Sequence, residues 1–397
     1  MVGCGLPASD QMASPFAPVR SSPNLVALTL ALFAASGSAR ADPPAVTAPL
    51  GGGTPGPIRQ LFLDPTLTDA RAVGSRSLAL RLETANSWSV PSVVTRGGHA
   101  VAMQLDVQAD GLLLAARVPW SALGGGSGSW HARVATTLRW RLTGFWGGFE
   151  DGGIEAWHHL VGAYNFQRNR YPRDRVNLRL AEQGATAFDL DSGRVAAGDL
   201  VVGTQVLLAS GGASRVADAA AREPAWGISA RLDLKAPTGS LARAGGSGGV
   251  DAGLALLAST ELASWAVLHG MVFGSVVSPL ASPVALQPRR FHAGLDVSLV
   301  LLAGRWAFIV EDRILSPLLE SGWTVLDGGD DRIYISSPAA ALFRTHNQFS
   351  VGLRRGPVTL ALSEDFTPGP NPRGAWKWFY NSNAPDVVLA LTVVTPF

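Results

Sequence analysis

Strict alternation of apolar and polar residues is the feature that most limits how this chain can fold. In one segment Leu232 and Leu234 alternate with Arg231, Asp233 and Lys235. The same period of two recurs in the segments 77–83, 101–108, 132–142, 226–235 and 291–301. Successive side chains of a β-strand point to opposite faces of the sheet. The pattern therefore predicts an all-β protein whose sheet has one apolar face and one charged face.

The alternation alone does not decide which face meets water. In a soluble secreted β-sandwich the leucine face forms the core, whereas in a membrane barrel it meets lipid and the charged face lines the lumen. The segments 97–108 and 288–303 favour the barrel, because they reach the roughly 9 to 11 residues that a tilted membrane strand needs. Tryptophans near strand ends also match the aromatic girdles of such barrels, namely Trp88, Trp120, Trp130, Trp140 and Trp306.

Both ends of the chain agree with a secreted barrel. Val387 to Phe397 is an uncharged, β-rich run that ends on an aromatic residue. The closing strand of a bacterial outer-membrane barrel has this form, and we expect the barrel-assembly machinery to recognise it through Phe397. At the other end, the apolar run Leu25 to Ala35 and the sequence Ala39-Arg40-Ala41 predict a signal peptide over residues 1–41.

Composition excludes several classes of protein. Without Arg20, Arg40 and Asp10 of the leader, the chain has 30 basic and 29 acidic side chains, which is not the footprint of a nucleic-acid-binding protein. The single cysteine, Cys4, lies in the leader, so the mature chain has neither a disulfide nor thiol chemistry. We expect no cofactor and no bound metal.

Weaker alternation marks further strands at 112–118, 176–180, 198–209, 250–258, 264–277, 305–313, 348–355 and 358–366. With the stronger segments and the closing strand, these predict a transmembrane antiparallel up-and-down β-barrel of about 12 to 14 strands. We expect residues 42–74 to enter the barrel and residues 75–397 to form it. The protein is then expected in the cell outer membrane, in contact with its lipid.

The strand pattern is interrupted most heavily between residues 144 and 175. Ile154 to Val161 has glycines before and after it, which predicts a short helix in this long loop. The motif Asp-x-x-Ile-Glu-x-Trp-His in the loop resembles the hallmark of an uncharacterised family of Gram-negative outer-membrane barrels, a domain of unknown function. The resemblance implies the fold and the location and brings no activity. The polar and aromatic residues that carry it are Asp151, Glu155, Trp157, His158, Arg168, Arg173 and Asp174.

Two interpretations of this loop remain open. Asp151, Glu155 and His158 would share one face of the helix, so an acid–base or metal site is geometrically possible. Alternatively, the carboxylates pair with arginines of the same loop, and the loop is a scaffold in which Trp157 packs as a hydrophobic plug. We favour the scaffold. The loop is expected outside the cell or folded into the lumen, because barrels have short periplasmic turns and long external loops.

Charges on the polar face are the more general functional feature. A lumen of mixed sign either closes through ion pairs between strands or lines a wet channel. We predict a non-catalytic narrow channel, import route or surface scaffold for an unknown small solute, with a barrel-embedded enzyme at the 144–175 loop as the alternative. The candidate lumen residues are Arg81, Glu83, Asp106, Arg117, Arg139, Arg141, Arg179, Arg231, Asp233, Lys235 and Asp296.

Overall fold

The computed structural model describes residues 47–52, 56–88, 92–96, 99–123, 130–148, 150–161, 172–216, 224–319, 324–326, 345–365, 369–370, 376–377 and 387–396. The predicted signal peptide and Phe397 lie outside these residues. Among the helices that it does describe, none is long and apolar enough to cross a membrane.

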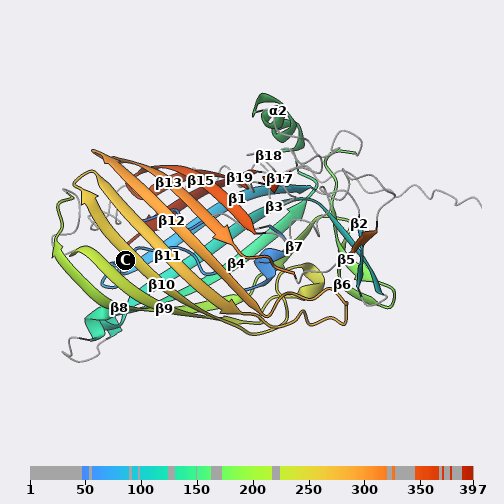
Figure 1. Ribbon diagram of the computed structural model, residues 1–397, viewed down its shortest axis with the longest axis horizontal. Coiled ribbons are helices and arrows are strands. Elements are labelled where there is room, and N and C mark those ends of the chain that lie inside the picture. The colour runs from blue at the N-terminus through green and yellow to red at the C-terminus, as the bar shows by residue number, and fades with distance from the viewer. Residues whose placement is uncertain are drawn as a thin grey trace, which may run out of the picture. The chain divides into compact units, whose positions relative to one another are not determined.

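Twelve of the described strands close into one antiparallel barrel (Figure 1). Each of the twelve pairs with the next one in the chain. The first pairs with the last, from Leu78 opposite Thr395 to Asn86 opposite Val387. The predicted up-and-down barrel is thereby confirmed and the β-sandwich is excluded. The strands are β1 (Ser77–Trp88), β3 (His99–Pro119), β4 (Val134–Trp146), β8 (Leu200–Ala213), β9 (Pro224–Ala236), β10 (Asp251–Ala263), β11 (Ala266–Val276), β12 (Phe291–Ala303), β13 (Trp306–Leu315), β15 (His346–Arg355), β16 (Val358–Asp365) and β19 (Val387–Thr395).

The two ends of the barrel differ in the length of their connections. At one end, which we call the turn end, β12 joins β13 and β15 joins β16 through two residues each, and β1 begins beside the end of β19. Gly304 and Gly356 have φ values of 59° and 56° in these tight turns, a conformation that glycine adopts without strain. The other end, the loop end, carries longer connections such as 147–199. Bacterial barrels have their short turns on the periplasmic side, so we expect the turn end to face the periplasm.

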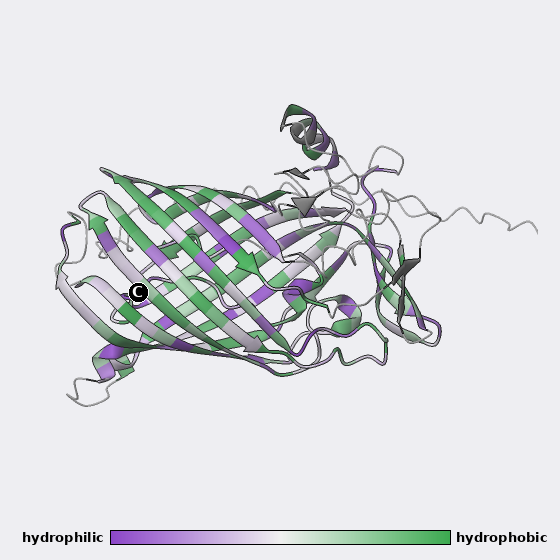
Figure 2. Cartoon of the chain, in the orientation of Figure 1, coloured by the Kyte–Doolittle hydropathy of each residue, from purple (hydrophilic) through white to green (hydrophobic). Residues whose placement is uncertain are grey.

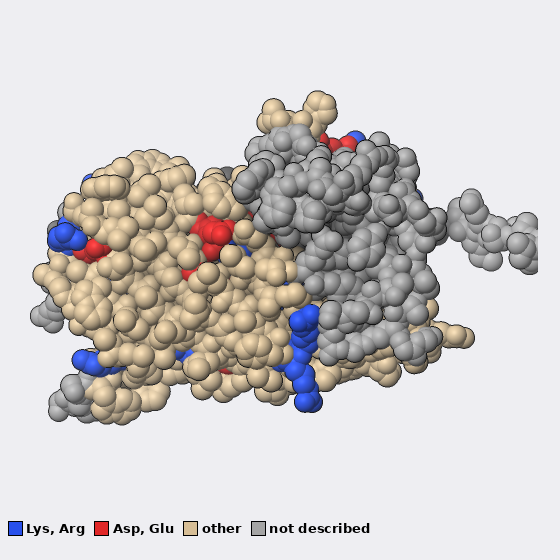
Figure 3. All heavy atoms as spheres, in the orientation of Figure 1, with Lys and Arg blue, Asp and Glu red and all other residues tan. Residues whose placement is uncertain are grey.

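The outer face of the barrel is apolar. Leu232, Leu234, Leu254 and Leu256 are 47 to 63% exposed on β9 and β10, and Figure 2 shows hydrophobic residues recurring along the strands. Figure 3 shows one side of this face as mostly uncharged, with charged residues near both ends and a small acidic patch between them. An exposed leucine surface of this extent needs hydrocarbon rather than water against it. The protein is an outer-membrane β-barrel.

Aromatic residues border the apolar face. Exposed tryptophans gather at the turn end, at Trp130, Trp226, Trp265 and Trp306, where an interfacial girdle belongs. The expectation that Trp88 belongs to this girdle is wrong, because its side chain is only 3% exposed. Position near a strand end does not show whether another segment covers the side chain.

Strand β3 corrects two of the sequence expectations. The segments 101–108 and 112–118 form one continuous strand, whose pairing with β1 and β4 has no register shift. Arg117 points into the lumen, where it donates to the carbonyl of Ala72. Since faces alternate without interruption, Val107 shares the inner face and Asp106 lies on the opposite one. Asp106 is therefore not a lumen residue, and the apolar residues from Val101 to Val107 do not meet lipid.

Those apolar residues of β3 instead belong to a core at the loop end. There β3 extends past the ring and pairs with β5 (Asn177–Glu182) and β2 (Ser92–Arg96). Further short strands there are β6 (Ala185–Leu190), β7 (Arg194–Ala197) and β14 (Thr324–Leu326), while β17 (Gly369–Pro370) and β18 (Trp376–Lys377) pair with each other. The core of this extension includes Val101, Met103, Leu105, Val107, Leu178, Leu180, Phe188, Leu61 and Phe62.

The described helical elements are short. They are η1 (Arg59–Leu61), η2 (Trp120–Leu123), η3 (His131–Arg133), η5 (Leu241–Arg243) and α2 (Asp151–Val161). Helix α2 overlaps the short helix that was predicted over Ile154 to Val161 and begins three residues earlier.

Candidate functional site

The N-terminal segment lies inside the barrel. Residues 47–52 and 56–73, which we call the plug, run as two arms joined by an apex at 56–62. Near the turn end, Ala48 accepts a hydrogen bond from Arg354, and Arg71 donates to the carbonyl of Pro224. At the loop end, Arg59 of the apex donates to the carbonyl of Ser316. The described ends of both arms therefore lie near the turn end.

The ascending arm, residues 47–52, is held through its backbone. The Glu311 carboxylate accepts hydrogen bonds from three successive amides, those of Leu50 at 2.9 Å, Gly51 at 3.3 Å and Gly52 at 2.5 Å. Arg354 donates from Nη1 to the carbonyl of Ala48 at 2.6 Å. Two neighbouring strands of the wall, β13 and β15, thus bind opposite polarities of one peptide backbone.

The descending arm, residues 63–73, is held through both backbone and side chains. Arg313 donates from Nη2 to Asp64 Oδ1 at 2.5 Å and to the carbonyl of Pro65 at 2.6 Å. Arg139 donates to Thr66 Oγ1 at 2.9 Å and Arg231 donates to Thr68 Oγ1 at 3.1 Å. Further contacts to plug carbonyls come from Gln205, Ser229 and Arg117.

A buried ion-pair group anchors the end of the descending arm. Arg71 donates from Nη2 to Asp69 Oδ2 at 2.7 Å, and its Nη1 lies 3.2 Å from Glu261 Oε1 on β10. All three side chains are at most 2% exposed. A buried charge without a partner is costly, so this group fixes the plug to the wall as a unit.

Most of the predicted lumen charges pair with one another behind the plug. Asp233 contacts Arg231 at 2.9 Å and Arg139 at 3.2 Å. Lys235 lies 2.8 Å from Asp199 and 3.1 Å from Asp251. Of the other predicted members, Asp296 lies 3.3 Å from Arg313, and Arg117 donates to the carbonyl of Ala72 in the plug. Arg179 is different, because it lies on β5, outside the ring, in a half-exposed pair with Asp189.

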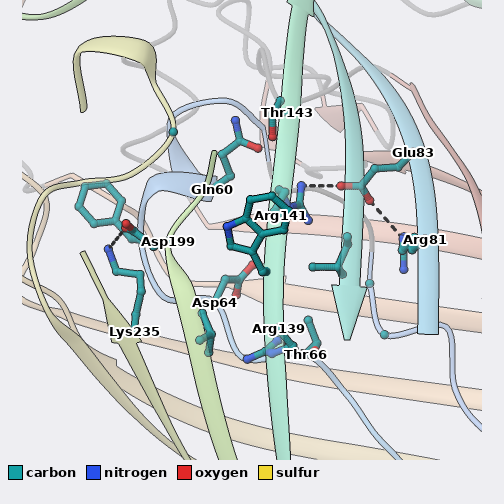
Figure 4. A pocket seen from close by; sticks show the side chains of 18 of the residues that line it. Gln60, Asp64, Thr66, Arg81, Glu83, Arg139, Arg141, Thr143, Asp199 and Lys235 are labelled. Atoms are coloured by element: carbon teal, nitrogen blue, oxygen red, sulfur yellow. Dashed lines mark hydrogen bonds and ion pairs between the residues drawn. The ribbon is translucent and has the colours of Figure 1, made fainter. Parts of the chain in front are cut away.

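A cavity of about 110 Å³ remains between the plug and the wall, and we call it the chamber. Figure 4 shows Glu83 between Arg81 and Arg141, with Gln60 and Thr143 nearby. Glu83 Oε2 lies 3.2 Å from Arg81 Nε, and Glu83 Oε1 lies 2.5 Å from Arg141 Nη1. Two guanidinium groups thus share one carboxylate. This corner of the chamber carries an excess of positive charge.

The apex of the plug meets the chamber on one side and the loop-end core on the other. Leu61 and Phe62 pack in that core, and Lys235 donates to the carbonyl of Leu61 at 2.9 Å. Burial lowers the pKa of Arg59 to about 10, while Asp64 acts against that shift. Arg59 remains charged at neutral pH, so the apex contributes a positive charge at the loop end of the barrel.

The 144–175 loop lies at the loop end, and the side chains of Glu150 and Asp151 form hydrogen bonds with outer-face residues of β1. Asp151 accepts hydrogen bonds from Asn86 Nδ2 at 2.7 Å and from the Asp174 amide at 2.9 Å. Glu150 accepts a hydrogen bond from Thr84 at 2.7 Å. Thr84 and Asn86 are on the face of β1 opposite to Glu83. The described part of the loop therefore does not fill the lumen.

The remaining residues of the loop motif are only partly described. Glu155 forms an ion pair with Arg173. The side chains of Trp157 and His158 and the whole of Arg168 lie outside the described residues. Among the described residues, no three His, Cys, Asp or Glu side chains are grouped as a metal site requires. The motif residues that can be placed contact one another and, through Asp151, strand β1.

Comparison with known proteins gives a family. The profile of a family described as "Protein of unknown function (DUF3187)" matches residues 25–287. The chain belongs to the DUF3187 family. This confirms the resemblance to an uncharacterised family that the sequence showed. A search of curated proteins found no relative of significant similarity.

Solved structures with a similar architecture are outer-membrane proteins of low identity. The COG4313 outer membrane channel from Pseudomonas putida F1 is 11% identical, with a TM-score of 0.43 over 84% of this chain and 100% of that one. LpxR from Salmonella typhimurium is 8% identical, with a TM-score of 0.34 over 81% and 100%. The CymD monoaromatic hydrocarbon channel is 11% identical, with a TM-score of 0.30 over 83% and 90%. Likeness at this level does not extend to function.

Several residues of the site in this DUF3187 member were not predicted. Glu311 and Arg313 lie in the predicted strand segment 305–313, but Asp312 stands between them and residues 306–310 are all apolar. The strict alternation that marked the other lumen residues is therefore missing there. Arg354 lies in 348–355, where Phe349, Val351 and Leu353 alternate with polar or small residues, so its period-two signal was present. The plug residues carry no such signal, because an irregular segment that fills a lumen has no strand periodicity.

Proposed function

We propose that this outer-membrane barrel is a gated channel for a small solute, closed by the plug and opened when the plug leaves through the turn end. The observation that carries the proposal is that charged side chains of the wall form their hydrogen bonds with the plug. Charged residues of at least six strands bind the plug, largely at backbone groups. The solute is of unknown identity.

The polarity of the inner wall supports the proposal that water fills the lumen in the open state. A wall that only packed against a fixed core could be apolar, since buried charge pairs are no more stabilising than well-packed apolar residues. Here Arg231, Asp233 and Lys235 remain paired with partners on the wall itself. These pairs would persist when water replaced the plug, and they would then line a channel.

The topology of the plug supports withdrawal as one piece. Its ascending arm begins and its descending arm ends near the turn end, and its apex packs at the loop end. A hairpin of this form can leave the lumen without threading. The many contacts to the wall mean that the closed state dominates until a ligand or partner favours the open one.

The 144–175 loop supports the non-catalytic interpretation. Asp151 and Glu155, the two carboxylates proposed for an acid–base site, are held by Asn86, the Asp174 amide and Arg173. We assign the loop a scaffolding role at the external rim of the channel. The Asp151→Ala variant should then loosen the rim, measured as faster hydrogen exchange in α2, without changing the conductance of an open variant.

The channel is tested by conductance in planar lipid bilayers. Wild-type protein should show rare openings, and a variant that lacks residues 47–73 should show stable, dose-dependent conductance. A matched control is Asp189→Asn, which removes a half-exposed ion pair outside the ring and should leave the conductance at the wild-type level. If the folded deletion variant conducts no better than wild type, the plug is a fixed core and the proposal fails. Folding of each variant is checked by the shift in gel mobility on boiling.

Assembly of the barrel gives a second proposed interaction. The uncharged final strand places its last residues beside the start of β1, with Thr395 opposite Leu78. We propose that the barrel-assembly machinery recognises this strand through Phe397. Removal of Phe397 should lower the amount of folded protein in the outer membrane, while the protein refolded in detergent should behave as wild type. Equal amounts of both proteins in the membrane would contradict the assignment.

A further inference from the structure

The groove that holds the ascending arm has the properties of a peptide-binding site. Its contacts to residues 48–52 are made to backbone amides and carbonyls, by Glu311, Arg354 and Arg81. Such contacts do not depend on which side chains the bound segment carries. Any extended peptide that presents the same order of carbonyls and amides can satisfy them.

The groove selects for two glycines. Gly51 and Gly52 have φ values of 77° and 72°, which residues with side chains rarely adopt. This conformation points three successive amides at the Glu311 carboxylate, as in the backbone nests that bind anions. A Cβ atom at Gly52 would also lie 3.0 Å from Arg313 Nη1. Two successive glycines are thus required for the backbone to reach Glu311.

The groove also selects for an aliphatic residue before the glycines. Leu50 packs against a cluster formed by Val267, Val300, Ala307 and Ile309. On β15, a Cβ atom at Gly352 would lie only 2.5 Å from Leu50 Cδ2. The missing side chain at Gly352 is what leaves room for the leucine.

The wall groups of this groove need a ligand when the arm leaves. Glu311 is 1% exposed and Arg354 is 7% exposed, and losing the arm removes the backbone partners of both. Only water would then replace the three amides at Glu311, whereas a second peptide with the same order of amides would restore all three hydrogen bonds. The groove is nearest to the turn end, since Arg354 adjoins the two-residue turn after β15. The ligand would therefore enter from the periplasmic side.

We propose that this groove binds an extended peptide of another molecule that carries an aliphatic residue followed by two glycines, in exchange for residues 47–52. The inference rests on the proposed gating, because it requires the arm to leave the groove. It names the class of ligand that would displace the ascending arm.

The test uses a fluorescein-labelled peptide, Thr-Ala-Pro-Leu-Gly-Gly-amide, and the full-length protein in detergent. The variant Gly51→Ala with Gly52→Ala should release the arm and bind the peptide saturably, measured by fluorescence anisotropy. Wild type should bind at least about tenfold more weakly, because its own arm competes for the groove. In the released variant that arm has lost hydrogen bonds to Glu311, and each such bond to a charged group contributes roughly tenfold or more in affinity. Equal and negligible binding to both proteins would overturn the proposal.

Matched peptides separate backbone recognition from non-specific binding. A peptide N-methylated at the leucine and both glycines cannot donate to Glu311 and should lose about tenfold or more in affinity. A peptide ending in Leu-Ala-Ala should lose binding because it cannot form the nest. Retained binding by either peptide contradicts the site. The Gly352→Val variant, made in the released background, should also lose binding because it fills the leucine notch.

Two further measurements keep the inference separate from the gating and from folding failure. If the released variant conducts in bilayers and does not bind the peptide, the peptide site is wrong and the channel stands. If it binds the peptide and does not conduct, the channel is wrong and the peptide site stands. Should the released variant fail to fold, hydrogen exchange on wild type decides: excess peptide should accelerate exchange of the amides of residues 50–52, and unchanged exchange overturns the proposal.

Discussion

Arg313 on the barrel wall and Asp64 in the plug form an ion pair of 2.5 Å, although 249 positions separate them in the chain. The Arg313 side chain is 2% exposed and also lies 3.3 Å from Asp296 on the neighbouring strand. This one guanidinium therefore joins the plug to the wall and neutralises a buried wall carboxylate. The two roles are separable by substitution.

Asp64→Asn should weaken the plug and spare the wall, whereas Arg313→Met should harm both. We expect Asp64→Asn to raise the open probability in bilayers, with a small change in the melting temperature of the barrel. Arg313→Met leaves Asp296 without its partner and should cost about 3 to 5 kcal/mol of folding free energy. Gel-mobility melting curves and single-channel recordings measure the two effects. Equal destabilisation by both variants would show that Arg313 does not serve the wall separately.

The chamber should confer anion preference on the open channel. Its lining includes five basic residues, Arg81, Arg139, Arg141, Lys235 and Arg313, against the acidic Asp64, Glu83 and Asp199. With the plug deleted, Asp64 is absent and the excess of positive charge grows. The reversal potential in a salt gradient should then indicate selectivity for anions, and Arg141→Gln should reduce that selectivity. Glu83→Gln is the opposite control and should increase it; a shift of the same sign in both variants would contradict this account.

A charge on the apolar outer face tests which surface meets lipid. Leu256 is 49% exposed near the middle of β10. Leu256→Arg should destabilise the barrel by about 2 to 4 kcal/mol if that residue meets the bilayer midplane. Leu123→Arg is the control, because Leu123 is 69% exposed in η2 beyond the strands, and it should cost about 1 kcal/mol or less. Urea titrations in lipid vesicles measure both; similar costs would place Leu256 outside the hydrocarbon.

Acidity should strengthen the attachment of the 144–175 loop. Burial raises the pKa of Glu150 above its ordinary value, while its hydrogen bond from Thr84 acts in the other direction. A carboxyl whose pKa is raised on folding destabilises the folded loop as pH rises from the unfolded-state pKa toward the folded-state pKa. Hydrogen-exchange protection factors in α2 should therefore be higher at pH 4 than at pH 7. Glu150→Gln should remove this difference, and a rise in protection with pH in wild type would contradict the assignment.

The loop motif shows where a local pattern stops being informative. Asp151 and Glu155 share a helical spacing that fits either an acid–base pair or two scaffold contacts. Their partners, Asn86 and Arg173, lie 65 and 18 positions away in the chain. Spacing along a helix describes which side chains are neighbours on it, and it carries no information about what the helix packs against.

The sequence by itself determined the closed all-β architecture and its place in the outer membrane. Strand periodicity is a local property, so it identifies lipid-facing and inward-facing residues wherever the chain is a simple strand. Only the tertiary structure decided that β3 is continuous, which moves Asp106 out of the lumen, and that residues 47–52 and 56–73 lie inside the barrel. The physical reason is that the polar face of a strand has the same pattern whether water or a second segment lies against it. Charges such as Glu311 and Arg313 find their plug partners some 250 positions away, and a period-two pattern does not encode such contacts.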